Sequence, residues 1–317
     1  MMLLVILYML FASTFTIGKA ALTYTTPIFF IGIRMLIGGL LLWIYQYMFN
    51  RSELHFDRKD VGLLAQVSFF QYYAAFILEF MSLQWITSSK ACLLFNFSPF
   101  ITAVISFFVL GEYLTNKKIA GLIIGFLGLM PILMETTSQE ELAGSISWFS
   151  IPELMLLGAV ISASYGWIVL KQTQNRGYST IMINAYTMTA AGIVALFTSC
   201  IVEGIPTIIP PEACLSKSLP WLCELLGPYG ASIAIFSLYA LALIVIANIV
   251  CFNLYGYLLS IYSVTFVSFA GFITPLFAAF FGWLFLSEKI GWPFVSSLVI
   301  VFLGLFLFSQ EELKLRA

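Results

Sequence analysis

Ten apolar runs follow one another along the chain, and each is long enough to cross a membrane as a helix. A helix needs about 20 apolar residues to span a bilayer. Unpaired backbone groups in lipid each cost several kcal/mol, so a helix is the expected form of every run. We therefore predict an all-α integral membrane protein with ten transmembrane helices. Their expected ranges are 1–21, 28–49, 61–82, 88–110, 117–134, 152–172, 180–202, 231–257, 263–286 and 291–309.

The composition agrees with a membrane protein. The chain is 61% hydrophobic and only 9% charged, whereas a soluble domain carries about 25% charged residues. Most of its surface is therefore expected to face lipid. The formal net charge of -1 gives no reason to expect a nucleic-acid partner. The first run has no basic segment before it and is long enough to span, so we expect no cleavable signal.

A pattern of proline, glutamate and glycine occurs twice in the chain. Each of four positions recurs 176 residues later, and three of the four keep their residue type. The pairs are Pro99 and Pro275, Glu112 and Glu288, Gly121 and Ser297, and Gly128 and Gly304. Such a recurrence indicates an internal repeat. The ten helices then divide into two units of five.

The two units are expected at 1–134 and 152–309, joined by an outer linker at 135–151 and followed by a cytoplasmic tail at 310–317. Because each unit has an odd number of helices, the second enters the membrane from the opposite side. Inverted repeats are typical of secondary transporters, which alternate access around a site near the middle of the membrane. The repeat therefore predicts transport by alternating access.

Lysine and arginine residues gather in one set of connections. With a cytoplasmic N-terminus, the inner loops and the tail hold nine of them, while the outer loops hold only Lys217 and Lys289. Positively charged loops favour the cytoplasmic side of a membrane. Both termini are therefore expected in the cytoplasm.

In each half, a proline within a span is followed thirteen residues later by glutamate, and glycines follow in the next run. This pattern resembles the EamA family of the drug/metabolite transporter superfamily, as do Gly18, Lys19 and the run from Pro27 to Arg34. Ser297, where a glycine is usual, is a departure. The resemblance implies a membrane transporter with a central cavity lined by the first, third, fourth, sixth, eighth and ninth helices. It leaves the substrate open, since the family moves amino acids, nucleotide-like metabolites and drugs.

The chain is also similar to the S-adenosylmethionine/S-adenosylhomocysteine exchangers of obligate intracellular bacteria. This resemblance implies a bacterial inner membrane and an exchange of these two metabolites. It further implies that Phe76, Phe252 and Tyr165 stack the base, and that Lys19 or Lys90 meets the methionine carboxylate. An exporter of amino acids, other metabolites or drugs is the alternative, followed by a flippase for a lipid carrier.

Polar and aromatic side chains form two seams at matching positions of the two halves. In each seam the residues are spaced i, i+4 and i+7, so that they share one face of an α-helix. The members are Tyr72, Phe76 and Glu79 in the third run and Asn248, Phe252 and Tyr255 in the eighth. We predict that both seams line a substrate pocket between the halves, with ordinary packing as the alternative.

Ionisable groups deep in a membrane are costly and are candidates for function. Glu79 has two open roles, binding a positive group of the substrate or carrying a proton, and its structural alternative is an ion pair with Lys90 or Lys19. Lys19 and Lys90 are predicted substrate contacts, with snorkelling to the outer surface as the alternative for Lys90. Arg34 is expected to bond helix ends at the outer interface.

Two further residues complete the predicted substrate-binding set. Asn96 lies near the middle of its span, where it either contacts substrate or bonds to another helix. In the sixth run, Tyr165 and Trp167 cannot both point inward. Tyr165 is chosen because Ser162 and Val169 flank its face.

Four residues are predicted to serve the fold and its gating. Pro99 and Pro275 each remove a backbone hydrogen bond within a span and are expected to act as hinges. Glu112 and Glu288 end their spans, and each is expected to cap the helix that follows it, since a carboxylate is favoured near a helix N-terminus.

The sequence offers little for catalysis or metal binding. His55 is the single histidine and lies in a charged loop, so we predict no enzyme, no cofactor and no metal site. No Walker motif is present, which argues against ATP as the direct energy source. A channel is disfavoured because neither polar seam is long enough. The expected partners are a small-molecule substrate and the lipid bilayer, with a monomer expected and a dimer left open.

Cysteine placement leaves one question open. Cys214 and Cys223 lie in the expected outer loop, where they either close a disulfide or remain thiols. Cys92, Cys200 and Cys251 lie in apolar runs and are expected to be small core residues.

Overall fold

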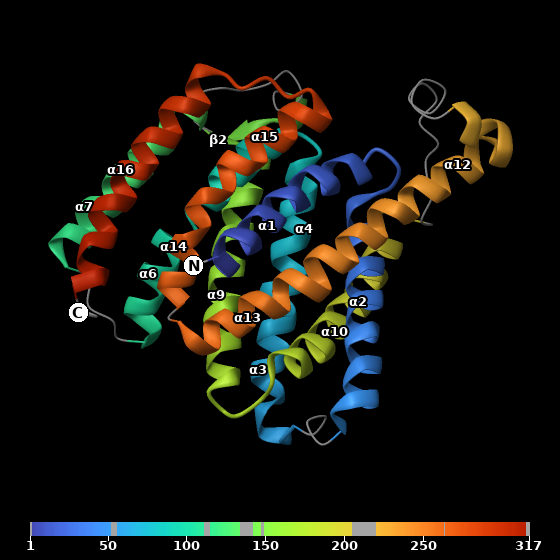
Figure 1. Ribbon diagram of the computed structural model, residues 1–317, viewed down its shortest axis with the longest axis horizontal. Helices are drawn as coiled ribbons and strands as arrows, with labels where there is room; N and C mark the ends of the chain where they lie inside the picture. Colours follow the sequence, from blue (N-terminus) through green and yellow to red (C-terminus); the bar gives the residue numbers. More distant parts are fainter. Residues whose placement is uncertain are drawn as a thin grey trace.

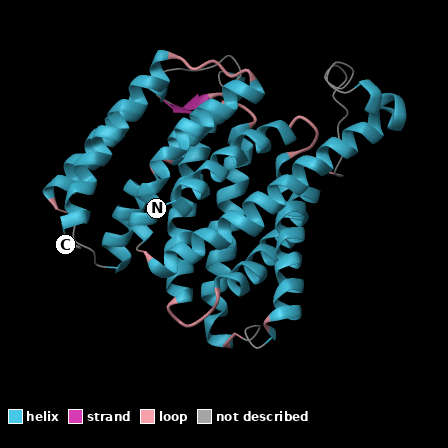
Figure 2. Cartoon of the chain, in the orientation of Figure 1, coloured by secondary structure: helices cyan, strands magenta, loops and turns pink. Residues whose placement is uncertain are grey.

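The computed structural model is almost entirely helical (Figure 2). It describes residues 2–51, 56–110, 115–133, 142–146, 149–204, 220–262 and 264–314. Within these ranges the strands are confined to one short antiparallel pair, β1 (Ser145–Ile146) and β2 (Phe149–Ser150), which directly precedes a long helix. His55, Glu112 and Cys214 lie outside the described residues, so the predictions for them, including a Cys214–Cys223 disulfide, stay predictions.

The helices of the first half follow the expected runs closely. They are α1 (Met2–Ala21), α2 (Pro27–Phe49), η2 (Arg58–Asp60), α3 (Val61–Gln66), η3 (Val67–Ala74), α4 (Ala75–Leu83), α5 (Ser88–Phe95), α6 (Ser98–Leu110) and α7 (Asn116–Leu133). The elements α3, η3 and α4 form one continuous helical stretch, in which η3 is a π-helix.

The second half has the same kinds of elements. They are α9 (Ile151–Gln174), α10 (Thr180–Val202), α12 (Pro220–Leu243), η4 (Ile244–Cys251), α13 (Phe252–Ile261), α14 (Val264–Ala270), η5 (Gly271–Ile273), α15 (Thr274–Leu286) and α16 (Trp292–Lys314). Here α12, η4 and α13 are continuous, and η4 is again a π-helix.

Seven helical stretches of the described chain are long and apolar enough to cross a membrane. They are Met2–Ala21, Pro27–Phe49, Arg58–Leu83, Ser88–Val109, Ile151–Gln174, Thr180–Val202 and Tyr229–Ile261. Three shorter apolar helices occupy the other expected runs, at Ile119–Gly128, Thr274–Leu286 and Trp292–Gly304. The protein is therefore an all-α, multi-pass membrane protein, and the count of ten transmembrane helices stays a prediction.

Large apolar side chains cover the outside of these helices. Phe108, Phe197 and Trp292 are 79%, 68% and 84% exposed. A water-soluble monomer rarely exposes contiguous apolar surface of this kind, and in a bilayer such side chains contact lipid. Cys200 is also exposed, so the expectation that it lies in the core was wrong, whereas Cys92 and Cys251 are buried.

Helices far apart in sequence lie side by side (Figure 1): α2 runs along α10, and α7 along α16. Glycines make these approaches close. A Cβ atom added at Gly192 would lie 2.4 Å from the Leu36 amide nitrogen, and one added at Gly304 would lie 2.6 Å from that of Gly125. Helix association in lipid depends on such packing because apolar surface gives no hydrophobic drive there.

The two proline-bearing spans are broken at the same point. Pro99 is the second residue of α6, directly after the helix interruption at residues 96–97. Pro275 is the second residue of α15, directly after the 3₁₀ turn η5. Proline lacks a donor N–H and fits the first turn of a helix better than its interior. Both spans are therefore interrupted just before their prolines, and the hinge function stays a prediction.

The glycine contact between α2 and α10 generates the first prediction. Replacing Gly192 with Ala forces a methyl group against the backbone of Leu36, which cannot move aside as a side chain can. Overpacking of this kind costs roughly 1–3 kcal/mol, so we expect a lower melting temperature in detergent. The matched control is Gly62→Ala, where an added Cβ meets nothing within 4 Å. Equal stability of the two variants would contradict the close approach.

Candidate functional site

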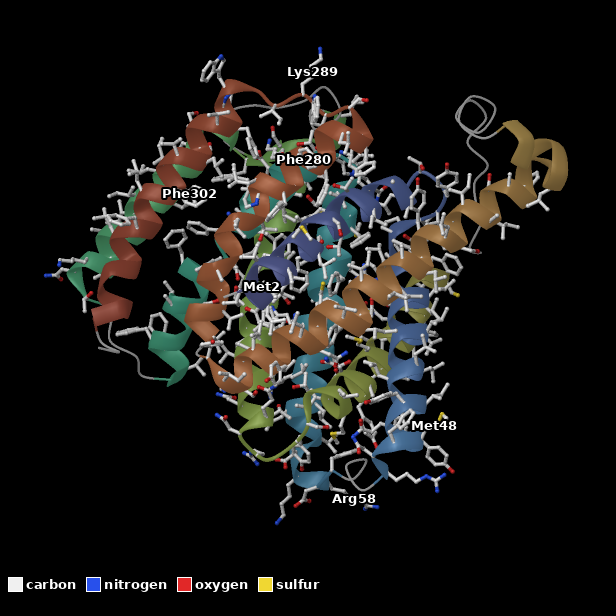
Figure 3. All side chains as sticks on the ribbon, viewed as in Figure 1. Met2, Met48, Arg58, Phe280, Lys289 and Phe302 are labelled. Carbon is white, nitrogen blue, oxygen red and sulfur yellow. The ribbon has the colours of Figure 1, made fainter. Side chains whose placement is uncertain are left out.

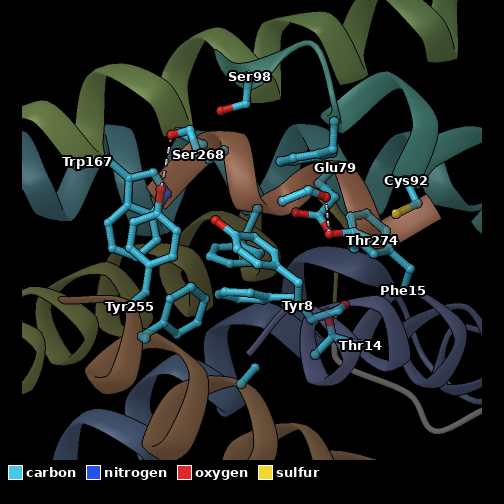
Figure 4. Close-up of a pocket in the computed structure, with 18 of the residues that line it drawn as sticks. Tyr8, Thr14, Phe15, Glu79, Cys92, Ser98, Trp167, Tyr255, Ser268 and Thr274 are labelled. Atoms are coloured by element: carbon cyan, nitrogen blue, oxygen red, sulfur yellow. Dashed lines mark hydrogen bonds between the residues drawn. The ribbon is translucent and has the colours of Figure 1, made fainter. Parts of the chain in front are cut away.

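A pocket lies at the centre of the helix bundle, between elements of both halves (Figure 4). It encloses about 130 Å³. Its lining residues are Tyr8, Phe11, Thr14, Phe15, Arg34, Gln71, Ala75, Phe76, Glu79, Phe80, Cys92, Phe95, Asn96, Ser98, Pro99, Ala163, Trp167, Ala247, Phe252, Tyr255, Ser268, Gly271 and Thr274. The elements that supply them include all six spans implied by the family resemblance, together with Arg34 from α2.

One end of the pocket carries charge. Glu79 of α4 and Arg34 of α2 both line it, are 7% and 1% exposed, and attract each other electrostatically. The carbon Cζ of Arg34 lies 4.7 Å from the ring centroid of Phe76 and 5.1 Å from that of Phe80. A guanidinium over ring faces gains cation–π attraction. Its Nε and Nη2 atoms have no hydrogen-bond partner within the described part of the chain.

The other end of the pocket is aromatic. Trp167 of α9 stacks on Tyr255 of α13 with 3.8 Å between ring centroids and 24° between planes. Phe252 connects this pair to the charged end, since its ring centroid lies 6.0 Å from that of Trp167 and 5.6 Å from that of Phe76, the ring beneath Arg34. In the view of Figure 4, Tyr8 stands between the Trp167–Tyr255 pair and Glu79. The pocket therefore offers stacking surfaces at one end and charges at the other.

Hydrogen bonds hold the aromatic end in place. With its amide turned so that the oxygen faces a donor, Gln71 accepts from Trp167 Nε1 at 3.3 Å and donates to the Ala163 carbonyl at 2.9 Å. The hydroxyls of Tyr255 and Ser268 lie 3.2 Å apart, and Tyr8 donates to the Val267 carbonyl at 2.5 Å. Such support fixes ring orientation before any ligand enters.

Five of the ten predicted substrate-binding residues line this pocket: Phe76, Glu79, Asn96, Phe252 and Tyr255. The other five, Lys19, Tyr72, Lys90, Tyr165 and Asn248, lie outside its lining. Their contacts show why.

Tyr72 and Asn248 lie behind the lining because both fall within π-helices. A π-helical turn bonds i to i+5 and holds an extra residue, which shifts the inward face by one position. Gln71 and Ala247, one residue earlier in each half, line the pocket instead. Tyr72 donates to Asn184 Oδ1 at 2.7 Å. The Nδ2 atom of Asn248 lies 3.1 Å from the sulfur of Met35.

The two lysines are occupied elsewhere. Lys90 Nζ lies 2.7 Å from Glu153 Oε1, and both side chains are buried, at 4% and 0% exposed. Lys19 Nζ lies 3.8 Å from Glu288 Oε1 and also donates to the Ile86 carbonyl. The suggested structural pairing of Glu79 with one of these lysines was therefore wrong, and so was snorkelling of Lys90.

Glu288 caps a helix, but not the one that follows it. Its carboxylate accepts hydrogen bonds from the backbone N–H and hydroxyl of Ser88, both at 2.8 Å, and from those of Ser89 at 3.3 and 3.0 Å. These serines begin α5, in the other half of the chain. The prediction of a cap was right in kind and wrong in its target. Glu203, after α10, binds the start of α2 in the same way, through the amides of Ile28 and Phe29.

In α9 the structure makes the choice opposite to the predicted one. Trp167 lines the pocket, while Tyr165 packs against Phe70 and donates to Gln66 Oε1 at 2.7 Å. Tyr165 is thus directed at α3, since that helix packs along α9.

The sequence analysis expected the first helix at the cavity but did not identify its lining residues, and it did not place Arg34 there. Tyr8, Phe11 and Phe15 are spaced i, i+3 and i+7, a stripe that could have been read from the sequence as one helix face. Arg34 was expected at the outer interface, yet it lies buried at the pocket. The sequence signal was its position seven residues into an apolar helix, where a charged side chain is energetically costly and therefore indicates a function.

Comparisons with known proteins give a consistent family. The family model described as the EamA-like transporter family matches residues 1–134 and 150–310. An S-adenosylmethionine/S-adenosylhomocysteine transporter of Chlamydia muridarum is 32% identical, over 96% of this chain and 90% of that protein. The transporter of the same name from Chlamydia trachomatis serovar D is 32% identical, over 96% and 87%. The transporter YvbV of Bacillus subtilis is 30% identical, over 65% of each chain.

A solved structure has the same fold. It is described as "Crystal structure of protein", and it superposes with a TM-score of 0.60 at 14% identity, over 99% of this chain and 98% of that chain. At this identity the likeness concerns the fold alone.

The buried ion pair between Lys90 and Glu153 generates the second prediction. Removing one partner leaves an uncompensated buried charge, which costs roughly 3–5 kcal/mol. We expect Lys90→Met to lower stability strongly. The double variant Lys90→Met/Glu153→Gln should recover much of the loss, because the neutral amide oxygen can still accept from the Ser150 amide at the start of α9. A double-mutant cycle of melting temperatures measures the coupling, with exposed Lys289→Met as control. If the losses of stability in the two single variants add up in the double variant, the two side chains are not coupled and the ion pair is contradicted.

Proposed function

The chain belongs to the EamA-like transporter family, and from that premise we propose that it exchanges S-adenosylmethionine for S-adenosylhomocysteine by alternating access. The proposed location is a bacterial inner membrane with both termini in the cytoplasm. The transporters of Chlamydia muridarum and Chlamydia trachomatis, at 32% identity over nearly the whole chain, support the choice of substrate.

The single observation that carries this proposal is the division of the pocket into an aromatic end and a charged end. An adenosyl amino acid has the same division: a flat base, and a tail with a carboxylate and an amino group. Trp167 and Phe252 offer stacking surfaces for the base. Glu79 offers a carboxylate to the positive groups of the tail, which in S-adenosylmethionine include the sulfonium. A cation beside ring faces gains roughly 0.5–2 kcal/mol.

The small size of the cavity supports a site that opens when the helices move apart. Its volume of about 130 Å³ is smaller than the roughly 300–1,000 Å³ of typical ligand pockets. A metabolite with a base, a ribose and an amino-acid tail needs the helices to separate before it binds. The interruptions before Pro99 and Pro275 lie beside the pocket and are the proposed hinges for this separation.

Matching elements support the proposed inverted repeat of two five-helix units, 1–134 and 152–309. Ser88 and Val264, the first residues of α5 and α14, are 176 positions apart, and α6 and α15 correspond at both ends with the same offset. The π-helices η3 and η4 differ by 177. Lys19 and Lys171, late in α1 and α9, each donate to a backbone carbonyl near the end of another span, that of Ile86 just after α4 and that of Leu259 near the end of α13. The two segments matched by the family model begin and end close to the proposed units.

The placement of charge supports the proposed orientation. Arg58 and Lys289 lie at opposite ends of the molecule (Figure 3). Of these two, Arg58 belongs to the connections that hold most of the lysine and arginine residues, which favours the cytoplasm for its end. The end that carries Lys289, Glu288 and the start of α5 then faces outward.

The test is uptake of radiolabelled S-adenosylmethionine into proteoliposomes, with and without S-adenosylhomocysteine inside. We expect preloading to stimulate uptake several-fold, because an exchanger returns its site most readily when loaded. Equal uptake into empty vesicles would contradict exchange and leave facilitated transport. Absence of uptake under both conditions would contradict the substrate, and amino acids would be the next compounds to test.

The pocket makes a specific prediction about aromatic residues. Trp167→Ala removes a stacking surface, and base stacking on aromatic side chains is worth roughly 1–3 kcal/mol. We expect the apparent KM for S-adenosylmethionine to rise about tenfold. The matched control is Tyr165→Phe, two residues away on the same helix but outside the lining, where we expect no change in KM. A larger effect at Tyr165 than at Trp167 would contradict the assignment of the site.

Glu79 generates a separate prediction. Glu79→Gln keeps the shape of the side chain and removes its charge, so a positive group of the substrate loses its counterion. We expect KM to rise about tenfold or more, since hydrogen bonds to charged groups contribute roughly 1.5–3 kcal/mol. The measurement is initial uptake at several pH values on both sides of the membrane. Unchanged KM combined with loss of dependence on a proton gradient would assign Glu79 to proton transfer instead.

A further inference from the structure

We propose that Arg34 is the site for the α-carboxylate of an amino-acid group, so that Arg34 and Glu79 together recognise a zwitterion. This inference rests on the proposed function in one respect, that the central pocket is where substrate binds. It goes further by naming the part of the substrate that the charged end recognises. Neither family membership nor the names of the relatives assigns a role to this arginine.

The guanidinium of Arg34 is buried and, within the described chain, lacks acceptors for two of its nitrogens. Arg34 is 1% exposed, and the pocket is the cavity that it lines. Its Nε and Nη2 atoms have no hydrogen-bond partner within the described residues. A buried donor without an acceptor destabilises the structure, and more so when it is charged. A ligand carboxylate can accept from both nitrogens at once, in the bidentate geometry that arginine favours.

Arg34 differs from Lys90, the other buried cation of the described residues. Lys90, also almost fully buried, has the Glu153 carboxylate at 2.7 Å. Arg34 instead lies over the faces of Phe76 and Phe80. Ring faces attract the positive charge but do not satisfy the in-plane N–H donors, which leaves the edge of the guanidinium available for a planar anion.

The charged residues of the pocket lining comprise one positive and one negative group. Glu79 and Arg34 are the two groups of the described lining that ordinarily carry full charge near neutral pH. A zwitterionic amino-acid group brings one charge of each sign and pairs with both. An amine without a carboxylate competes with Arg34 for the charge of Glu79 and brings no acceptor for the guanidinium, which a site of low dielectric penalises. The pocket should therefore reject decarboxylated ligands.

The experiment compares two competitors that differ only in the carboxylate. S-adenosylhomocysteine is set against its decarboxylated amine as inhibitors of labelled S-adenosylmethionine uptake by the full-length protein in proteoliposomes. We expect the wild-type protein to prefer the carboxylate-bearing competitor by at least about tenfold. Arg34→Gln should abolish this preference, and Arg34→Lys should keep part of it. The matched control is Arg176→Gln, which removes a more exposed arginine paired with Asp60 and should leave the preference intact.

Each outcome bears on the proposal. Equal inhibition by both competitors in the wild-type protein overturns it, and so does an undiminished preference in a folded Arg34→Gln variant. If Arg34→Gln does not fold, Arg34→Lys and the wild-type preference still decide.

A protein that transports no adenosyl compound would refute the proposed function and not this inference. The probes are then L-methionine and its decarboxylated amine, 3-(methylthio)propylamine, measured by thermal stabilisation. Stabilisation by the amino acid alone, lost in Arg34→Gln, supports the zwitterion site, and stabilisation by both or by neither overturns it.

Discussion

The lack of water in the bilayer core governs this structure, because every polar group placed there needs a partner from the protein. The chain meets this demand in several places: Lys90 with Glu153, Tyr72 with Asn184, and the start of α5 with Glu288. At the cavity, Arg34 and Asn96 carry buried donor atoms that have no hydrogen-bond partner among the described residues. Buried polar atoms without a partner also occur elsewhere in the described chain, but the charge of Lys90 is paired there, and unmet donors of a charged group beside a cavity call for an explanation that a bound ligand provides.

Much of the architecture was accessible from the sequence because lipid allows so few solutions. Apolar runs predicted the helices, and the starts of α5 and α6 recur 176 residues later as those of α14 and α15, the spacing of the sequence repeat. Pro99 and Pro275 marked the interruptions, since proline in a span removes a hydrogen bond that no water can replace. Phe76 and Glu79 were placed in the pocket by simple helical spacing, because α4 is a regular α-helix.

The wrong predictions concern side chains whose direction is set by tertiary packing and not by local helix geometry. Helical spacing failed at Tyr72 and Asn248 because π-turns displaced both faces by one residue, and nothing in a single sequence announces such a turn. The choice of Tyr165 over Trp167 rested on flanking residues, whereas the packing of α9 against α3 decides it. Glu288 was matched to the nearest helix in sequence, but its true partner begins 200 residues earlier. Contacts between residues so far apart in sequence depend on how the helices are arranged in the folded chain.

The carboxylate of Glu288 has a consequence for the thermodynamics of a transport cycle. It joins the loop after α15 to the first turn of α5, so separating these elements breaks its hydrogen bonds to two serines. Hydrogen bonds to a charged group contribute roughly 1.5–3 kcal/mol each. In the proposed alternating-access cycle these bonds would favour the closed state at this end, and the binding energy of the substrate would have to offset them. Under the proposed exchange mechanism, such a bias would keep the empty carrier from reorienting and so make the two opposing fluxes stoichiometric.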